Sequence, residues 1–298
     1  MASRQKHLKR STSDYVLFGF IGLAAMITML LIVVPILSGM ALSFFKISSF
    51  SVSSAPKFVG LSNYESVLGD GSLFNALRNG LVFSLSSIIV QLAVALAVAL
   101  LLNTQFYGRG VIRTALILPM LVPPVVITLL FKWMTNETFG IVPAALRNLG
   151  IGSVAWHSPD MAMVQVVLLG MWLWAPFMIV SILAELQSIP ATLYEASRVD
   201  GATPVQQFFH ITLPHLANVI GIILLLRMIW TFNNFDLIWL TTGGGPLGLT
   251  ETMSILSYRQ SFTQFNIGTG AATATIAFLT LLSVVIVALK YLPVARDD

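Results

Sequence analysis

The sequence contains no cysteine and little charge. The absence of cysteine excludes disulfides, thiolate metal sites and cysteine nucleophiles. Asp, Glu, Lys and Arg make up 9% of the 298 residues, against roughly 25% in an ordinary soluble domain. Because 56% of the residues are hydrophobic, most of the surface cannot face water. These values predict a membrane protein.

Sequence patterns of catalytic, metal and nucleotide sites are also missing. No phosphate loop of the form G-x-x-x-x-G-K-[ST] occurs, and the run 243–246, Gly-Gly-Gly-Pro, lacks the lysine and is expected to form a turn. His210 and His215 are the only close histidines, but their spacing and Pro214 between them place them on different helix faces. The net charge of +4 is spread over an apolar chain and forms no dense basic face for nucleic acid. We therefore expect no catalytic residue, no metal site and no cofactor in this chain.

Six apolar stretches are long enough, or nearly so, to cross a bilayer. We expect spans at Tyr15–Leu37, Leu81–Leu102, Thr114–Phe131, Met161–Ala184, Leu216–Leu240 and Gly268–Leu289. The first stretch is too long for the apolar region of a signal peptide and no small-x-small cleavage pattern follows it, so it is expected to be retained. Lys and Arg are denser in the segments that would face the cytoplasm if both termini lie inside. The expected organisation is an all-α membrane protein with a cytoplasmic tail, 1–14, and one transmembrane domain, 15–298.

The segment 185–215, between the fourth and fifth stretches, is predicted to form two short helices with a break. Pro190 suits a first helical turn, and Gly201 suits the position just past a helix end, where positive φ is needed. Thr203, Pro204 and Gln206 then have the spacing of a capping box. From the residues alone, this stiff elbow is either a docking surface for another protein or an amphipathic helix that lies on the membrane.

The same segment carries a recognisable motif. Glu195-Ala196-Ser197, Gly201 and the later Ile211-Thr212-Leu213-Pro214 resemble the EAA signature of permeases in binding-protein-dependent ABC importers, with Ser197 where the general signature has a second alanine. Two further segments look like the carbohydrate-importer branch that contains the maltose permease: 58–64 (Phe-Val-Gly-Leu-Ser-Asn-Tyr), and 232–236 through 242–246. The resemblance covers nearly the whole chain.

The resemblance implies a type I ABC importer permease fold and a set of partners. It implies a second homologous permease, a dimer of ATP-binding subunits that hold ATP and Mg, and an extracytoplasmic solute-binding protein, in a bacterial cytoplasmic membrane whose lipid surrounds the spans. It further implies that the elbow is a coupling helix that docks on the ATPase, through Glu195, Ala196, Ser197, Asp200 and Gly201.

Polar and aromatic side chains share faces of two predicted spans. Ionisable groups at membrane depth are candidate pathway residues. The i, i+3, i+4, i+7 spacing groups Arg227, Trp230, Thr231 and Asn234 on one span, and Gly170, Leu173, Trp174 and Phe177 on another. Aromatic plates with amide and guanidinium donors suit a sugar, and the faces are similar in position to the sugar site of the maltose-permease branch. Ordinary packing, pairing of Arg227 with Asp236 or backbone carbonyls, and a phosphorylated or anionic solute such as glycerol phosphate stay open.

Two other classes of function compete with an ATP-driven importer. An ion-coupled carrier would ordinarily need carboxylates in its spans, and Asp236 alone is a weak basis for one. A membrane enzyme would need a Ser/His, paired-carboxylate or H-E-x-x-H arrangement, which the spans lack.

Overall fold

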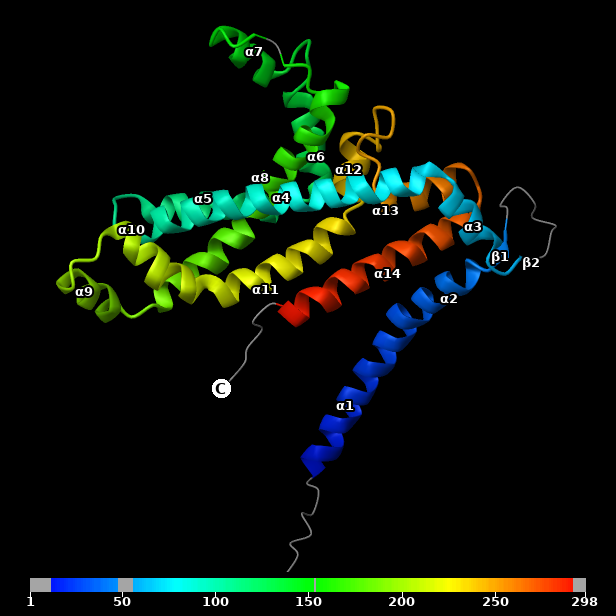
Figure 1. Ribbon diagram of the computed structural model, residues 1–298, viewed down its shortest axis with the longest axis horizontal. Coiled ribbons are helices and arrows are strands. Elements are labelled where there is room, and N and C mark those ends of the chain that lie inside the picture. The colour runs from blue at the N-terminus through cyan, green and yellow to red at the C-terminus, as the bar shows by residue number, and fades with distance from the viewer. Residues whose placement is uncertain (1–11, 48–55, 153, 292–298) are drawn as a thin grey trace, which may run out of the picture.

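The computed structural model describes residues 12–47, 56–152 and 154–291, and in this part of the chain the protein is almost entirely helical (Figure 1). Five helices are long and apolar enough to cross a membrane. They comprise α1 (Thr12–Thr28) with the π-helical turn η1 (Met29–Val33) and α2 (Val34–Leu42); α4 (Gly71–Asn103); α8 (Pro159–Ser188); α10 (Pro204–Gln207) with η2 (Phe208–Thr212) and α11 (Leu213–Phe232); and α14 (Ile267–Tyr291). Each overlaps a stretch that the sequence predicted. The basic residues before residue 12 lie outside the described part.

The third apolar stretch, which the sequence predicted as a span, is not one continuous helix. It consists of α5 (Arg109–Leu121) and α6 (Pro124–Met134), which meet at an angle of 101°. Val122 and Pro123 have extended backbones, with ψ of 132° and 136°, because a residue that precedes proline is sterically excluded from the helical region. The described residues therefore contain five spans, or six if the bent pair counts as one.

The fifth stretch was also predicted too long. α11 ends at Phe232, and a separate helix, α12 (Asp236–Thr241), follows. Asn234 ends the continuity, because its side-chain oxygen accepts a hydrogen bond from the backbone N–H of Leu237 at 3.2 Å, as an N-terminal capping side chain does. Pro176, in contrast, lies inside α8 without ending it.

The centre of the bundle is the contact between α4 and α8, with α11 against both. Ala95 and Ala99 of α4 are fully buried and let α8 approach closely, as small residues do between membrane helices. Phe83, nearer the start of α4, packs with Val166 of α8, whereas Leu102, at its end, packs in the cluster that contains Leu186. The two helices are therefore parallel.

The first apolar helix leaves this bundle (Figure 1). Its most apolar stretch, between Gly19 and Leu42, is not buried by the rest of the chain. The contact between this helix and α14 is made by α2. A two-stranded hairpin, β1 (Phe45–Lys46) and β2 (Lys57–Phe58), and α3 (Ser62–Gly69) follow. Asn63 donates to the carbonyls of Ser43 and Phe45 at 2.7 and 3.0 Å. The sequence predicted an all-α protein, and this short hairpin is a small correction to that prediction.

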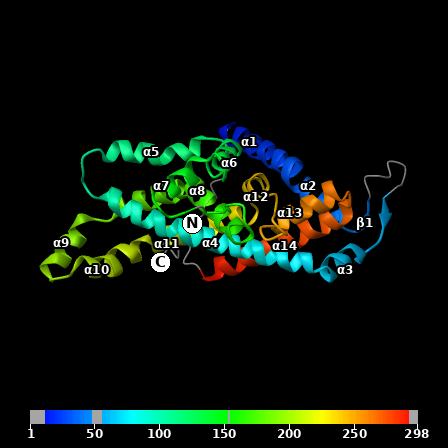
Figure 2. The same ribbon diagram turned by 90° about the horizontal axis from the view of Figure 1, so that it is seen from above.

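The remaining helices lie at the two ends of the bundle. α9 (Ala191–Val199) and α10 project at one end, and β1 and α3 lie at the opposite end (Figure 2). α7 (Ile141–Asn148) precedes α8, and α13 (Met253–Tyr258) with the π-helical turn η3 (Arg259–Thr263) precedes α14. Since α8 runs from α7 to α9, these two helices lie at opposite ends of the same span.

Candidate functional site

The elbow that follows α8 is built by local backbone geometry. Pro190 caps the start of α9, and Gly201, with φ of +77°, follows its end. The N–H groups of Gly201 and Ala202 bond to the carbonyls of Arg198 and Ser197 at 3.1 and 2.9 Å, which is the Schellman arrangement of helix ends. The left-handed turn predicted at Gly201 is therefore present, and it reverses the chain sharply between α9 and α10.

Side chains tie α9 to the helix that follows. Thr203 and Gln206 form the predicted capping box at the start of α10. Gln207 donates to the Ser197 hydroxyl at 2.7 Å, and the hydroxyls of Tyr194 and Thr212 lie 2.9 Å apart. Because Thr212 is the last residue of η2 and α11 begins at Leu213, these hydrogen bonds connect α9 directly to the start of α11.

The outer face of the elbow is open to a partner. Glu195, Ala196, Asp200 and Gly201 are exposed, and Val199 is 88% exposed. A hollow of about 320 Å³ lies beside them, lined by Ser197, Asp200, Gly201, Ala202, Gln206, Gln207, His210 and Ile211. The five predicted coupling residues thus lie together on α9 and its end, although Ser197 is half-buried because it holds Gln207.

A second cluster surrounds Arg227 in the middle of the bundle. Its guanidinium donates to Gln91 of α4 at 3.0 Å and to Thr231 of α11 at 3.2 Å, and its central carbon lies 4.8 Å from the ring centre of Trp174 on α8. Arg227 is 3% exposed, so three helices meet at one buried cation. Among the described contacts, Arg227 pairs neither with Asp236, which is exposed, nor with a backbone carbonyl.

Gly170 explains how Trp174 reaches this cluster. A Cβ at Gly170 would lie 3.1 Å from the Trp174 ring and 3.4 Å from Leu237, so the ring occupies the space that glycine leaves. The Gly170 carbonyl also accepts a long 3.5 Å contact from the amide of Gln91. Leu173, one turn away, is 2% exposed and belongs to the apolar core.

The remaining predicted binding residues lie apart from Arg227. Phe177 packs edge-on against Trp230, with ring centres 5.7 Å apart, and Trp230 is 50% exposed. Asn234 lies beyond the end of α11, so the helical spacing that grouped it with Arg227 does not hold there. The predicted faces therefore divide into a buried polar cluster, an exposed aromatic pair and a capping asparagine.

Sequence reasoning missed Gln91, which completes the buried cluster. It is fully buried and is the only amide side chain in the predicted second span, a signal that could have identified it. Ser84 and Ser87 lie two turns and one turn before it on the same face of α4, and Gln165 lies on α8. These three side chains are buried in the described structure without a hydrogen-bond partner there.

Comparison with known proteins agrees with this architecture. Residues 91–294 match the family described as "Binding-protein-dependent transport system inner membrane component". The trehalose/maltose transport system permease protein MalF of Thermococcus litoralis is 34% identical over 94% of this chain and 95% of its own length. The sulfoquinovosyl glycerol transport system permease protein SmoG of Agrobacterium fabrum is 33% identical over 90% and 87%. The sn-glycerol-3-phosphate permease UgpA of the same organism is 33% identical over 79% and 80%.

A solved structure shares the fold. One chain of a bacterial ABC transporter involved in the import of the acidic polysaccharide alginate superposes with a TM-score of 0.80, at 21% identity, over 93% of this chain and 95% of its own. The matched region covers most of the length of both chains. The chain belongs to the family of binding-protein-dependent transport system inner membrane components, the permease subunits of ABC importers.

Proposed function

We propose that this permease subunit carries a sugar or sugar-like solute across the bacterial cytoplasmic membrane. Permeases of this family are not enzymes, because separate ATPase subunits hydrolyse ATP. The relatives named for trehalose/maltose and for sulfoquinovosyl glycerol support a glycoside as the solute. The exposed Trp230 beside Phe177 supplies the aromatic surface on which the apolar face of a sugar ring stacks.

The observation that carries the coupling role is the exposed, rigidly capped α9. It is proposed to dock on one subunit of an ATPase dimer, with Glu195 and the turn at Gly201 in the contact. Glu195→Lys and Gly201→Asp are expected to leave the complex in the membrane while ATP hydrolysis no longer drives uptake. Glu137→Lys is the matched control, because Glu137 is an exposed glutamate before α7, at the other end of α8. Wild-type uptake in both elbow variants would refute the coupling role.

A second, homologous permease is the proposed partner within the membrane. The first apolar helix has no part of its window buried by its own chain, so its packing partner must be lipid or another subunit. The two permeases would enclose a central pathway that alternates between outward-facing and inward-facing states as the ATPase closes and opens.

The proposed topology places both termini and α9 in the cytoplasm. The start of α1 and the end of α14 both point away from the hairpin, since α2 leads into β1 and the N–H of Ile267 bonds to the carbonyl of Ile47 at 3.1 Å. The chain has no cysteine, so single-cysteine variants need no prior engineering. Thr192→Cys is expected to react with an impermeant maleimide only in inside-out vesicles, and Leu247→Cys only in right-side-out vesicles. The opposite pattern would invert the topology.

An anionic solute is the second candidate, and the glycerol-3-phosphate relative favours it. A guanidinium could bind a phosphate bidentately, but Arg227 is 3% exposed and donates to Gln91 and Thr231. If the solute is a neutral sugar, Arg227→Gln reduces uptake of neutral solutes and no anionic solute is transported by the wild type. If the wild type imports an anionic solute and the variant loses only that activity, the second candidate is correct.

A further inference from the structure

A polar hollow of about 330 Å³ lies at the end of the bundle opposite α9. Ser72, Asn75, Arg78 and Asn79 line it from the first turns of α4, Leu247, Gly248, Leu249 and Glu251 from the loop after α12, and Arg259 from η3. It is separate from the elbow and from the Arg227 cluster. In the proposed topology it opens on the extracytoplasmic side.

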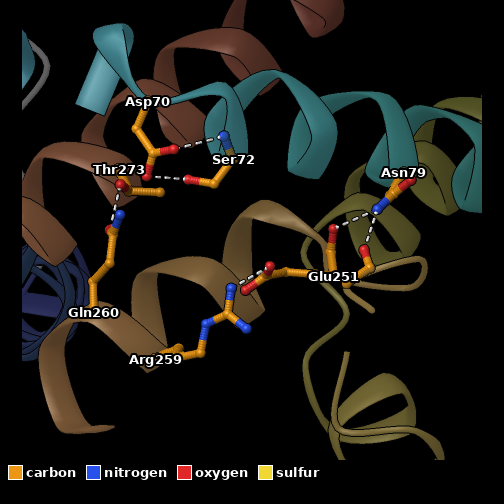
Figure 3. Close-up of polar contacts among 8 residues, drawn as sticks. Asp70, Ser72, Asn79, Glu251, Arg259, Gln260 and Thr273 are labelled. Atoms are coloured by element: carbon orange, nitrogen blue, oxygen red, sulfur yellow. Dashed lines mark hydrogen bonds and ion pairs between the residues drawn. The ribbon is translucent and has the colours of Figure 1, made fainter. Parts of the chain in front are cut away.

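The loop that forms one wall of this hollow is held in a single shape. Thr250 bonds to Thr242 at 2.6 Å and to the carbonyl of Gly245 at 2.9 Å. Asn79 fastens the loop to α4, because its amide donates to the carbonyls of Gly248 and Glu251 at 2.8 and 3.1 Å (Figure 3). A rigid wall of this kind loses little conformational entropy when a partner binds.

The charged side chains that line the hollow differ in whether they are paired. Glu251 is 5% exposed and forms an ion pair with Arg259 (Figure 3), so these two charges offset one another. Arg78 is exposed, and among the described residues no hydrogen bond or ion pair is found for it. Asn75 is exposed beside it. Among the residues that line the hollow, the unpaired charge is therefore the positive charge of Arg78.

Apolar side chains at the rim complete the surface. Leu247 is 93% exposed at the tip of the loop, and Leu249 is 43% exposed. Protein interfaces combine such apolar contacts with arginine, which is enriched at their centres. Loose lipid contact does not explain the rigid polar wall.

We infer that this hollow is a docking surface for the extracytoplasmic solute-binding protein, which places an acidic side chain against Arg78 and an apolar patch against Leu247. The inference rests on the proposed function, since an importer of this family depends on a solute-binding protein, and it names the surface and the chemistry by which that protein is recognised. Complementary charge at the rim of an interface chiefly accelerates association and falls with salt. A basic or neutral patch on the partner would gain nothing from Arg78.

The test uses the complete importer in lipid nanodiscs, titrated with its cognate solute-binding protein while ATP hydrolysis is followed. Arg78→Glu is expected to raise the half-maximal concentration of binding protein by about tenfold at low ionic strength, and by less at high ionic strength. Arg147→Glu is the matched control, because Arg147 is an exposed arginine on α7, at the same end of the spans but outside the hollow. It is expected to behave as the wild type.

Two further measurements keep the test decisive. Basal ATP hydrolysis of Arg78→Glu should equal that of the wild type, and a benzophenone attached at Leu247→Cys should crosslink to the binding protein. Arg78→Glu with an unchanged titration, or a change equal to that of Arg147→Glu, overturns the inference while the proposed function stands. If Arg78→Glu does not assemble, the crosslinking experiment decides: no crosslink from Leu247→Cys to the binding protein overturns the inference. If no binding protein stimulates the wild type, the proposed function itself fails.

Discussion

Gln91→Leu removes the acceptor that holds Arg227 between three helices. The Nε of Arg227 then loses its 3.0 Å hydrogen bond, whereas the contacts to Thr231 and Trp174 stay. A hydrogen bond to a charged group contributes about 1.5–3 kcal/mol. Because Arg227 is 3% exposed, water cannot replace the lost acceptor without repacking. We expect the free energy of unfolding to fall by about 2 kcal/mol.

A double-mutant cycle separates this contact from general loss of packing. Arg227→Met alone leaves the buried Gln91 amide with only its long contact to Gly170, and is expected to cost about 1–3 kcal/mol. In the double variant both polar groups are gone and the site is apolar, so the second substitution costs little. The expected coupling is about 2 kcal/mol, well above the average of about 0.6 kcal/mol for hydrogen bonds between membrane helices.

The assay is equilibrium unfolding of the purified subunit in bicelles, monitored by helicity for the wild type, both single variants and the double variant. Costs that add within about 0.5 kcal/mol would refute the reasoning, because they would mean that Gln91 and Arg227 do not interact. Uptake by the double variant adds a functional reading. A stable double variant that no longer transports would show that the Gln91–Arg227 pair also acts on the pathway.

Four further predictions concern other parts of the structure. Gly268→Ala should lower the melting midpoint by several degrees, because the new Cβ would collide with the carbonyl of Phe45. Gly39→Ala is the control, because the space around Gly39 is open, and it should leave the midpoint equal or higher. Equal shifts in the two variants would contradict this packing. Arg259→Ala should destabilise the loop by about 2 kcal/mol by leaving a buried carboxylate unpaired, and adding Glu251→Gln should restore stability; no recovery would refute the pairing. Burial raises the pKa of the Glu251 carboxyl above its ordinary value, although Arg259 opposes this shift. The folded state therefore binds the carboxyl proton more tightly than the unfolded state, and the melting midpoint should fall as the pH rises from the ordinary pKa to the raised one. Glu251→Gln should remove this pH dependence, and a slope that persists in this variant would assign it to another group. Gln207→Leu should reduce uptake per ATP hydrolysed, because it cuts the link from α9 to η2; unchanged coupling would show that the link is dispensable.

The elbow could be predicted from the sequence because its geometry is local. Positive φ at Gly201 and the Thr203 capping box depend on residues within one or two turns, and each residue type there has few conformations open to it. The docking role proposed for the elbow rests on the family motif, because the geometry alone leaves the role open. The turn at Gly201 and the capping box at Thr203 are therefore present as the sequence predicted.

The single helical face predicted for Arg227 and Asn234 is absent, because the prediction assumed an uninterrupted helix. Hydropathy does not register that a new helix begins at Asp236, just after Asn234, nor that the chain bends by 101° between α5 and α6. The partnership of Gln91 with Arg227 joins residues 136 positions apart, and no period within one helix can show it. Arg227 was identified correctly as unusual, but its surroundings depend on how three helices pack.

The bent pair α5 and α6 also constrains the order in which the chain can reach its final shape. At 1.5 Å per residue, helices of this length extend roughly 20 Å or less, short of the hydrocarbon thickness of about 30 Å. Neither half can cross a bilayer alone, and each packs on a later helix, α5 on α8 and α6 on α12. The bend itself is set locally by the two prolines, but the chain must be synthesised at least to Thr241 before both helices of the bent pair can make these contacts.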